Sequence, residues 1–367
     1  MSEASSQPLR PRKGRGAVGN ATGRYESEAR VAFDDGWGSL DEEPLPLDTT
    51  YTRDSAKSII AHNDSPDIPF DSSINPYRGC EHGCIYCYAR PAHAYMGLSP
   101  GLDFESKLFF KEGAARLLTR ELAKPSYKVG PIHIGGNTDP YQPSERRLQV
   151  TRQVLEVLER TGHPASIITK LALIVRDADI LGRMGRRGLI RVAISVTTLD
   201  RKLARIMEPR AATPERRLSA VTALTGAGAP VGVMFAPVIP GLNDHELEAV
   251  LERAAEAGAV GAGYVVLRLP REIKDLFREW LESQVPDRAR RVMSLIRQMR
   301  DGRDYDAEWG KRMKGEGPLA EMLGKRFAIA KRRFGLDRPS TPLDLTQFRR
   351  PGVSTNQPDL FELDQAS

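Results

Sequence analysis

The sequence predicts an α/β fold: a partial, TIM-like (β/α)6 barrel over residues 61–285, with a flexible N-terminal arm and a helical C-terminal appendage. Short β-branched runs alternate with stretches of helical periodicity, which predicts parallel strands joined by right-handed helical crossovers. Six such units fit into about 210 residues, too few for a closed eight-unit barrel and suited to an open one. The chain has 367 residues, 40% of them apolar, enough for one large α/β domain.

Residues 1–60 are predicted to form the flexible basic arm. They are rich in Gly, Ser, Arg and Asp and show little periodicity, which is typical of segments that bury no core. The arm carries five basic residues with no acidic residue among them: Arg10, Arg12, Lys13, Arg15 and Arg24.

The barrel strands are expected at buried, β-branched runs, each followed by a helix. A first strand precedes Cys80, and five more runs follow, at 131–135, 165–169, 190–196, 231–238 and 263–267. Because the strands are parallel, functional side chains are expected at their carboxyl ends.

Three of the helices have recognisable signals. The helix expected over 144–160 shows helical spacing of Leu148, Thr151, Leu155 and Leu158. Another begins with Thr213 as cap before Pro214. A third is expected to begin at Asn243, with Glu246 three residues later as a variant of the capping box.

The C-terminal part is predicted to comprise a helical basic appendage over 286–338 and a flexible tail over 339–367. The segment 288–300 is helical in pattern, whereas the tail contains four prolines. A second basic set is diluted only by Glu316 and Glu321, and consists of Lys311, Arg312, Lys314, Lys325, Arg326, Lys331, Arg332 and Arg333.

Composition excludes several classes of protein. The first fifteen residues lack the apolar stretch of a secretory signal, and no window approaches the roughly twenty apolar residues of a membrane span. We therefore expect a cytoplasmic protein with no membrane partner. The net charge of +6 is mild, and over the whole chain it is what a solvated surface carries. Three cysteines in so long a chain cannot form a disulfide framework.

All three cysteines, Cys80, Cys84 and Cys87, lie on one predicted loop after the first strand. Gly79 and Gly83 give this loop the tight backbone that convergence of the thiols requires. Thiolates are soft ligands for zinc or for iron–sulfur clusters. Three of them on a 4Fe-4S cubane leave the fourth iron open to chelation by an amino group and a carboxylate, such as those of S-adenosylmethionine. Two alternatives are a set of inert buried thiols and a Cys3His zinc site.

The zinc alternative needs a histidine as fourth ligand. His82 or His93 is near enough in sequence to complete such a tetrahedron. Zinc sites of this kind usually consist of two ligand pairs separated by a knuckle, and the sequence has no second pair of cysteines.

The spacing of three and then two residues between the cysteines, with the aromatic Tyr86 before the last one, resembles the signature of the radical S-adenosylmethionine (radical SAM) superfamily. The resemblance implies that Cys80, Cys84 and Cys87 bind a 4Fe-4S cluster that receives an electron from an external reductant. It implies that S-adenosylmethionine is cleaved to methionine and a 5′-deoxyadenosyl radical, while the protein positions and shields the cofactors. It also implies that Tyr86 lies beside the adenine.

The resemblance extends to the ends of later strands. Gly135 and Gly136 match the family's glycine-rich motif, in which an acidic residue holds the amino group of the cofactor. This sequence has Asn137 there instead, so the resemblance leaves open whether Asn137 or Asp139 takes that role. A plain turn is the alternative for Asp139 before Pro140.

Further cofactor contacts are implied at the third and fourth strands. Lys170 is a candidate to bind the carboxylate, and Arg210 competes for the same role. Hydroxyl groups of Ser195, Thr197 and Thr198 are candidates for the ribose, although polar residues at strand ends are also common caps. The turn 236–243 resembles the family's adenine-contacting turn.

Four segments, INPYRGCEHGCIYCYAR, TDPYQPSE, ITK and APVIPGLND, resemble most closely the branch related to spore photoproduct lyase, over residues 70–285. That lyase uses a further cysteine as hydrogen donor, and this chain has none to spare. The resemblance therefore implies a lyase-like or other radical reaction, and assigns no catalytic residue beyond the cluster. Together with the two basic sets it predicts a nucleic-acid substrate, DNA or RNA. The alternative function is a non-catalytic zinc- or cluster-bearing nucleic-acid-binding module.

The tail segment Gln357–Phe361 resembles the short peptide by which bacterial repair proteins dock on the replication sliding clamp. Leu360 and Phe361 would enter a preformed pocket while Gln357 bonds at its rim, at a modest ordering cost. The alternative is that Leu360 and Phe361 pin the tail to the protein's own surface.

Overall fold

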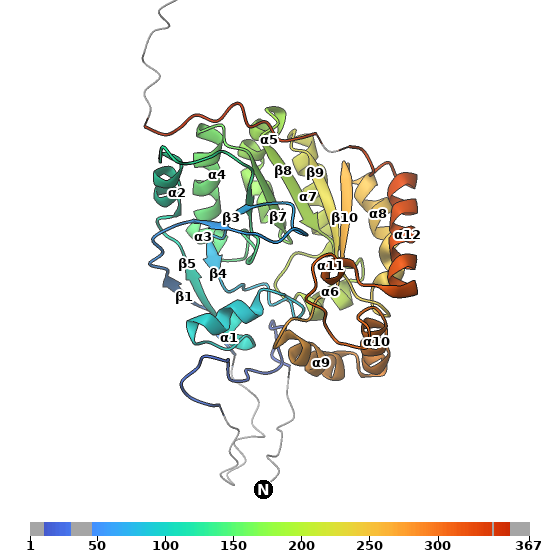
Figure 1. The fold of residues 1–367 in the computed structure, drawn as a ribbon. Coiled ribbons are helices and arrows are strands. Elements are labelled where there is room, and N and C mark those ends of the chain that lie inside the picture. Colours follow the sequence, from blue (N-terminus) through green and yellow to red (C-terminus); the bar gives the residue numbers. More distant parts are fainter. Residues whose placement is uncertain (1–10, 31–45, 340, 353–367) are drawn as a thin grey trace, which may run out of the picture.

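The computed structural model describes residues 11–30, 46–339 and 341–352 (Figure 1). Within these residues the main sheet has seven strands in the spatial order β10, β9, β8, β7, β6, β3, β2. Their bounds are β2 Ile60–His62, β3 Ser72–Ile74, β6 Ile132–Ile134, β7 Ala165–Thr169, β8 Ile190–Ser195, β9 Val231–Val238 and β10 Gly261–Val266. The six strands from β3 to β10 pair in parallel, and β2 pairs antiparallel with β3.

This sheet confirms the predicted parallel strands and their alternation with helices. The six parallel strands lie side by side in chain order, so each crossover leads to the neighbouring strand. The helices that flank the sheet (Figure 1) include α2 Ala114–Leu122, α4 Val150–Arg160, α5 Ala178–Arg186, α7 Pro214–Gly226 and α8 Leu247–Glu256. Shorter elements complete the connections: α1 Leu102–Ser106, α3 Glu145–Leu148, α6 Arg201–Met207, η1 Arg90–Met96, η2 Ala172–Asp177 and η3 Asp244–Glu246.

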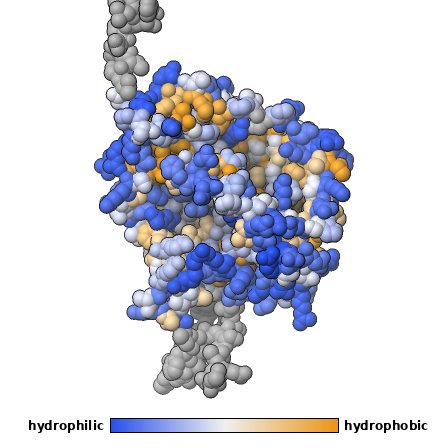
Figure 2. Space-filling view, viewed as in Figure 1, coloured by the Kyte–Doolittle hydropathy of each residue, from blue (hydrophilic) through white to orange (hydrophobic). Residues whose placement is uncertain are grey.

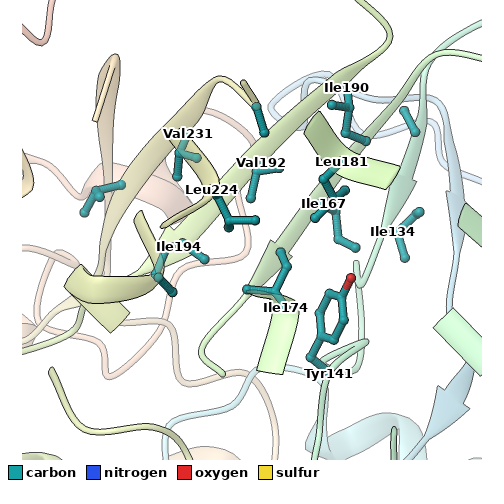
Figure 3. Packing of buried hydrophobic residues seen from close by; sticks show 14 of the residues in the cluster. Ile134, Tyr141, Ile167, Ile174, Leu181, Ile190, Val192, Ile194, Leu224 and Val231 are labelled. Atoms are coloured by element: carbon teal, nitrogen blue, oxygen red, sulfur yellow. The ribbon is translucent and has the colours of Figure 1, made fainter. Parts of the chain in front are cut away.

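The core lies between the sheet and its helices (Figure 3). Inward side chains of the strands, such as Ile167, Val192 and Val231, meet Leu181 of α5 and Leu224 of α7, and all of these are buried. Burial of each such side chain contributes about 1.5–3 kcal/mol. This packing holds the strands in register and so fixes their carboxyl ends, where the polar side chains gather.

A second, small sheet was not predicted from the sequence. It has the order β1, β5, β4, with β1 Thr50–Arg53, β5 Lys107–Phe110 and β4 Tyr77–Arg78. β4 is only two residues long, too short to give a periodic signal. Because Cys80 follows β4 by two residues, this sheet fixes the start of the cysteine loop.

Two of the predicted helices differ from the structure. The single helix expected over 144–160 is broken at Gln149, whose φ of 51° is left-handed and ends α3 before α4 begins. The predicted capping box at Asn243 is wrong. Its side chain caps no helix, and instead accepts a bond from the Ile239 N–H (2.6 Å) and donates to the Thr197 carbonyl (2.6 Å). Only the cap at Thr213 is confirmed, by its bond from the Arg216 N–H (3.4 Å).

The prediction of a flexible arm is wrong for residues 14–20. Arg15, Ala17 and Val18 are buried there. The N–H groups of Gly16 and Ala17 donate to the carboxylate of Glu105 at 2.9 and 2.8 Å. The segment is ordered because a buried acceptor satisfies its backbone donors. We call residues 14–20 the N-terminal strap.

The C-terminal helices are part of the same body and do not form an appendage. They are α9 Ile273–Gln284, α10 Pro286–Gln298, α11 Lys311–Lys314 and α12 Gly317–Arg333. α12 packs on α8, and its Leu323 and Phe327 belong to the main core. In the part of the chain that the structure describes, no helix combines the length and apolar character needed to cross a bilayer.

Candidate metal centre

Cys80, Cys84 and Cys87 lie on a loop that follows β4 at the carboxyl edge of the main sheet. Gly79 (φ 72°) and Gly83 (φ 67°) are left-handed, which confirms the predicted tight turns of this loop. The Cys80 N–H donates to the Phe104 carbonyl (2.9 Å) and the Cys87 N–H to the Cys84 carbonyl (3.2 Å). These bonds fix the backbone from which the three thiols project.

The chemistry of the three thiols fits an iron–sulfur cluster. Burial raises the pKa of Cys80, Cys84 and Cys87, and the nearby carboxylates of Asp139 and Glu208 raise it further at Cys80 and Cys84. Metal binding must therefore displace their protons. In the described ranges no three His, Cys, Asp or Glu side chains are arranged to hold a single metal ion. A cubane makes a different demand, since each thiolate binds its own iron.

A buried ion pair braces the cysteine loop. Arg90 Nη2 lies 2.5 Å from Glu105 Oε1, and both side chains are fully buried. Arg90 also donates to the carbonyls of Gly83 (3.1 Å) and Cys84 (2.9 Å). Breaking a buried pair by removing one partner typically costs about 3–5 kcal/mol. Arg90 and Glu105 therefore link the loop to the N-terminal strap.

The end of β6 carries the predicted glycine motif. Gly135 has φ 91°, and a Cβ there would lie 2.6 Å from Pro140 Cδ, so the position requires glycine. The Gly136 carbonyl accepts a bond from the Tyr88 hydroxyl. Asn137 is exposed, and its side chain forms no hydrogen bond with any residue that the structure describes. This amide is therefore available to a bound molecule.

Asp139 is occupied by the protein itself. Its carboxylate accepts bonds from the Tyr141 N–H (2.9 Å), the Thr169 hydroxyl (2.6 Å) and the Lys170 N–H (2.8 Å), and lies 3.4 Å from His82 Nδ1. Burial alone would raise the pKa of Asp139, but His82 and these bonds lower it to about 2. With all its acceptor positions used, Asp139 is placed to join the loop after β6 to the end of β7. The geometry therefore favours Asn137 over Asp139 as the cofactor contact.

Lys170 follows β7 and Ser195 ends β8, and these two neighbouring strand ends meet Tyr86 of the cysteine loop. Lys170 Nζ donates to Ser195 Oγ (2.8 Å) and lies 5.7 Å from the centre of the Tyr86 ring. Burial lowers the pKa of Lys170, partly opposed by the charge of Cys84. The ammonium group thus stands within electrostatic reach of the thiols and of any carboxylate bound at the open iron.

A buried carboxylate, Glu208, holds the other side of this cluster. It accepts bonds from the Thr197 hydroxyl (2.7 Å) and from the hydroxyl of Tyr86, and it forms a buried ion pair with Arg217. The hydroxyl oxygen of Thr197 also lies 3.2 Å from the Ala236 carbonyl oxygen. The Tyr86 ring is therefore fixed by its hydroxyl.

Arg210 and Thr198 are used inside the protein. Arg210 forms an ion pair with Glu81, next to Cys80, and its N–H donates to the His82 carbonyl (3.3 Å). The Thr198 hydroxyl donates to Glu246. Lys170 is consequently better placed than Arg210 to bind a carboxylate.

The histidines of the zinc alternative differ in their surroundings. His82 faces Asp139 and is buried. His93 packs edge-on against Phe104 at 5.6 Å, and burial lowers its pKa to about 4. Among the described residues neither ring nitrogen of His93 has a hydrogen-bond partner.

Sequence reasoning missed the groups that position the site. Arg90, Glu105, Glu208 and Arg217 are buried and charged, but each finds its partner through tertiary packing. The one signal in the sequence was the presence of the charged residues Glu208 and Arg217 on either side of the helix cap at Thr213, where the pattern predicts buried positions.

Comparisons with known proteins agree with this arrangement. The family model described as the radical SAM superfamily matches residues 74–254, which contain all three cysteines and the strands from β4 to β9. An uncharacterized protein of Mycobacterium tuberculosis is 36% identical over 285 residues, 75% of this chain and 78% of that protein. An uncharacterized protein of Methanocaldococcus jannaschii is 28% identical over 173 residues, 47% of this chain and 62% of that protein.

A solved structure of spore photoproduct lyase, complexed with dinucleoside spore photoproduct, has a TM-score of 0.52 to this chain. The two are 15% identical, and the match covers 77% of this chain and 78% of that one. A mutant form of the same lyase gives a TM-score of 0.51. At this level of identity the likeness concerns the fold alone.

Proposed function

Because the chain belongs to the radical SAM superfamily, we propose that it is an enzyme that reductively cleaves S-adenosylmethionine at a 4Fe-4S cluster, to give a 5′-deoxyadenosyl radical that acts on a further substrate. The observation that carries the proposal is the placement of three thiols on one braced loop, with Cys80 and Cys84 buried and Cys87 partly buried, beside Lys170, Ser195 and Tyr86. The six parallel strands would then form the wall of a partial barrel around this site.

The chain's own residues would divide the work. Cys80, Cys84 and Cys87 would hold the cluster. Lys170 would pair with the carboxylate of the cofactor, and the side chain of Asn137 would accept a bond from its amino group. These roles follow from the ammonium group of Lys170 and from the side-chain amide of Asn137, which has no hydrogen bond among the described residues.

Further residues would fix and shield the cofactor. Ser195 would offer its hydroxyl to the ribose. Thr197 could contact the ribose only as an acceptor, because its hydroxyl donates to Glu208. Tyr86 would offer a buried aromatic face to the adenine. Gly135 and Gly136 would let the backbone approach closely. Burial of the loop would exclude water, and an external one-electron reductant would supply the electron.

Nucleic acid is the substrate class that we propose. The fold resembles that of a lyase solved with a dinucleoside photoproduct, and the chain is basic, with a net charge of +6. The two basic sets of the sequence are weaker support than their composition suggests. Arg15 is buried, Arg24 pairs with Glu272, and Arg312 pairs with Asp67. Sliding-clamp docking through Gln357–Phe361 stays a proposal, because that segment lies outside the described residues.

The runner-up is a binding module that holds zinc or a cluster without catalysis. A binding module has no need of an ammonium group beside the thiols, which is what Lys170 provides, bonded to Ser195 and close to Cys84. The arrangement therefore favours an enzyme. We expect it to act in the cytoplasm, where thiols stay reduced.

Anaerobic reconstitution with iron and sulfide, followed by S-adenosylmethionine and a reductant, tests the proposal. The wild-type chain should acquire a cluster and release 5′-deoxyadenosine. Cys80→Ala, Cys84→Ala and Cys87→Ala should each remain folded and release none, because none of the three belongs to the main core between the sheet and its helices. A wild-type cluster that never yields 5′-deoxyadenosine would favour the binding module, and full activity of any single variant would refute the ligand assignment.

A further inference from the structure

Exposed tyrosines and arginines are interleaved on the surface that leads to the cysteine loop. Tyr88 directly follows Cys87 and is 45% exposed, and Tyr95, seven residues later, is 64% exposed. Arg268 and Arg271 follow β10 on the neighbouring side of the carboxyl edge. The Arg268 guanidinium lies 4.9 Å from the Tyr88 ring centre, and Arg271 Nη1 lies 3.5 Å from the Tyr95 hydroxyl.

The four residues thus form two successive tyrosine–arginine pairs. A third tyrosine extends the row, since Tyr25 is 56% exposed and stacks on Tyr95 with ring centres 5.4 Å apart. We define Tyr25, Tyr88, Tyr95, Arg268 and Arg271 as the aromatic–arginine strip. It begins beside the proposed cluster and runs outward along the surface.

Arg268 has hydrogen-bonding capacity that the protein does not use. Among the described residues its Nε is buried without a hydrogen-bond partner, and its Nη1 reaches only the weak acceptor Met313 Sδ at 3.7 Å. No carboxylate in the described ranges pairs with it, whereas nearby Arg312 lies 2.5 Å from Asp67. A buried donor without an acceptor costs about 1–3 kcal/mol. An anionic group bound here would remove that cost.

A basic hollow continues the strip beyond Arg271. It has a volume of about 520 Å³ and is lined by Arg271, Lys274, Arg297 and Arg303, with Asp304 as the acidic side chain. α11 lies at the end of β10 nearby (Figure 1), and hydrophilic side chains cover the region of α9, α10 and α11 (Figure 2). Arg297 pairs with Asp304 (2.7 Å) and Arg303 with Asp306 (3.2 Å), whereas Arg271 and Lys274 have no carboxylate partner among the described residues. These two cations are available to the phosphates of a nucleic acid.

We propose that the aromatic–arginine strip binds single-stranded or locally unpaired nucleic acid and delivers one nucleotide to the cluster. Bases stack on the exposed tyrosine rings, and the phosphates between them bind Arg268, Arg271 and the hollow. Aromatic stacking with flanking cations is how proteins hold unpaired strands, whereas bases inside a duplex offer no free face. This inference rests on the proposed enzyme and names the recognition surface of its substrate.

Fluorescence anisotropy of a labelled twelve-residue oligothymidylate, added to anaerobically reconstituted protein without reductant, tests the strip. Replacing Tyr88 or Tyr95 by Leu should each weaken binding about tenfold, since one stacked base contributes about 1–3 kcal/mol. Phenylalanine at either position should retain most of the affinity, because the ring is kept. The double variant Arg268→Gln, Arg271→Gln should lower the slope of log affinity against log salt by about 1.4.

Matched controls separate the strip from general charge. Arg253→Gln removes one arginine charge on α8, away from the carboxyl edge, where Arg253 pairs with Glu256. It should lower the slope by less than half of the change expected for one arginine of the strip. Thermal melts identify variants that are misfolded, and the phenylalanine variants then carry the comparison. Wild-type affinity in the leucine variants, an equal loss in Arg253→Gln, tighter binding of a duplex of the same length, or displacement of the oligonucleotide by an acidic peptide would each overturn the proposal.

The two proposals fail in different ways. Release of 5′-deoxyadenosine by a wild-type protein that binds no oligonucleotide would overturn the strip and leave the enzyme. Strip-dependent binding by a reconstituted protein that never cleaves S-adenosylmethionine would retain the strip as a binding surface and overturn the enzyme.

Discussion

At the residue scale, Tyr86 shows how one side chain is fixed for a task. Its hydroxyl is held by Glu208, and its ring faces the ammonium group of Lys170. Tyr86→Ala should weaken S-adenosylmethionine binding about tenfold, near the upper end of an aromatic contact, while iron content stays at the wild-type level. Tyr86→Phe should lose less, because the ring remains. Equilibrium binding and iron analysis of both variants decide this, and a parallel loss of iron and cofactor would contradict it.

His163 predicts a pH dependence of stability. It is fully buried, its Nε2 lies 2.7 Å from the Tyr127 hydroxyl, and burial lowers its pKa to about 4. Between about pH 6.5 and 4 the unfolded chain binds a proton at this site that the folded chain does not. The contribution of His163 is therefore complete above pH 6.5 and falls by about 3 kcal/mol as the pH drops to 4.

The His163→Gln variant removes this titration. Urea unfolding at pH 7 and pH 4.5 should show a smaller acid loss in the variant than in the wild type, whatever its stability at pH 7. The same loss in both proteins would mean that His163 titrates at its ordinary pKa.

The proposed cluster ligands could be predicted from the sequence, whereas the buried charged residues that hold the loop in place could not. Cys80, Cys84 and Cys87 can be recognised by their spacing, because few residue types can bind the iron of a cluster. Glu105 and Glu208 have no such signature. Each is a single buried charge whose partners, Arg90 and Arg217, were fixed only by the folded chain. For the same reason Asp139 was open to two interpretations until its four partners were known.

At the element scale, the N-terminal strap is an ordered segment that the sequence did not predict. A Cβ on Gly16 would lie 1.7 Å from the Gly83 carbonyl oxygen, so strap and cysteine loop touch backbone to backbone. Gly16→Ala must therefore push them apart, at a cost of about 1–3 kcal/mol. Hydrogen exchange should be faster at the Ala17 amide, because its hydrogen bond to the Glu105 carboxylate would be weakened.

Gly130→Ala is the matched control, because nothing lies within 4 Å of a Cβ at that position. It should leave both stability and exchange unchanged. Equal exchange of the Ala17 amide in Gly16→Ala and the wild type would show that the strap does not depend on this contact.

Most of the predicted strands are longer than the strands that were missed, although β3 and β6 have only three residues each. β7, β8 and β9 contain β-branched runs of five to eight residues in which at least every second side chain is buried. β1 and β4, of four and two residues, have no room for a pattern. The break at Gln149 also left no signal, since glutamine is an ordinary helix residue and nothing in its side chain favours the left-handed φ of 51°.

At the scale of the whole molecule, α12 completes the main core. Phe327 is 7% exposed and packs against Tyr264 with ring centres 4.6 Å apart. Phe327→Ala should lower the free energy of unfolding by about 3–5 kcal/mol, as for a core aromatic. Lys325→Ala, on the exposed side of the same helix, should change it by less than about 0.5 kcal/mol. Urea unfolding that showed equal, small effects would restore the picture of a separate appendage.

The central claim is that three thiols on one loop hold a cluster whose fourth iron accepts S-adenosylmethionine. Electron paramagnetic resonance of the reduced, reconstituted protein, recorded with and without S-adenosylmethionine, tests it most directly. Coordination of the cofactor to the open iron should change the spectrum in the wild type, with a higher cofactor concentration needed in Lys170→Ala. A cluster spectrum that saturating S-adenosylmethionine leaves unchanged would contradict the claim.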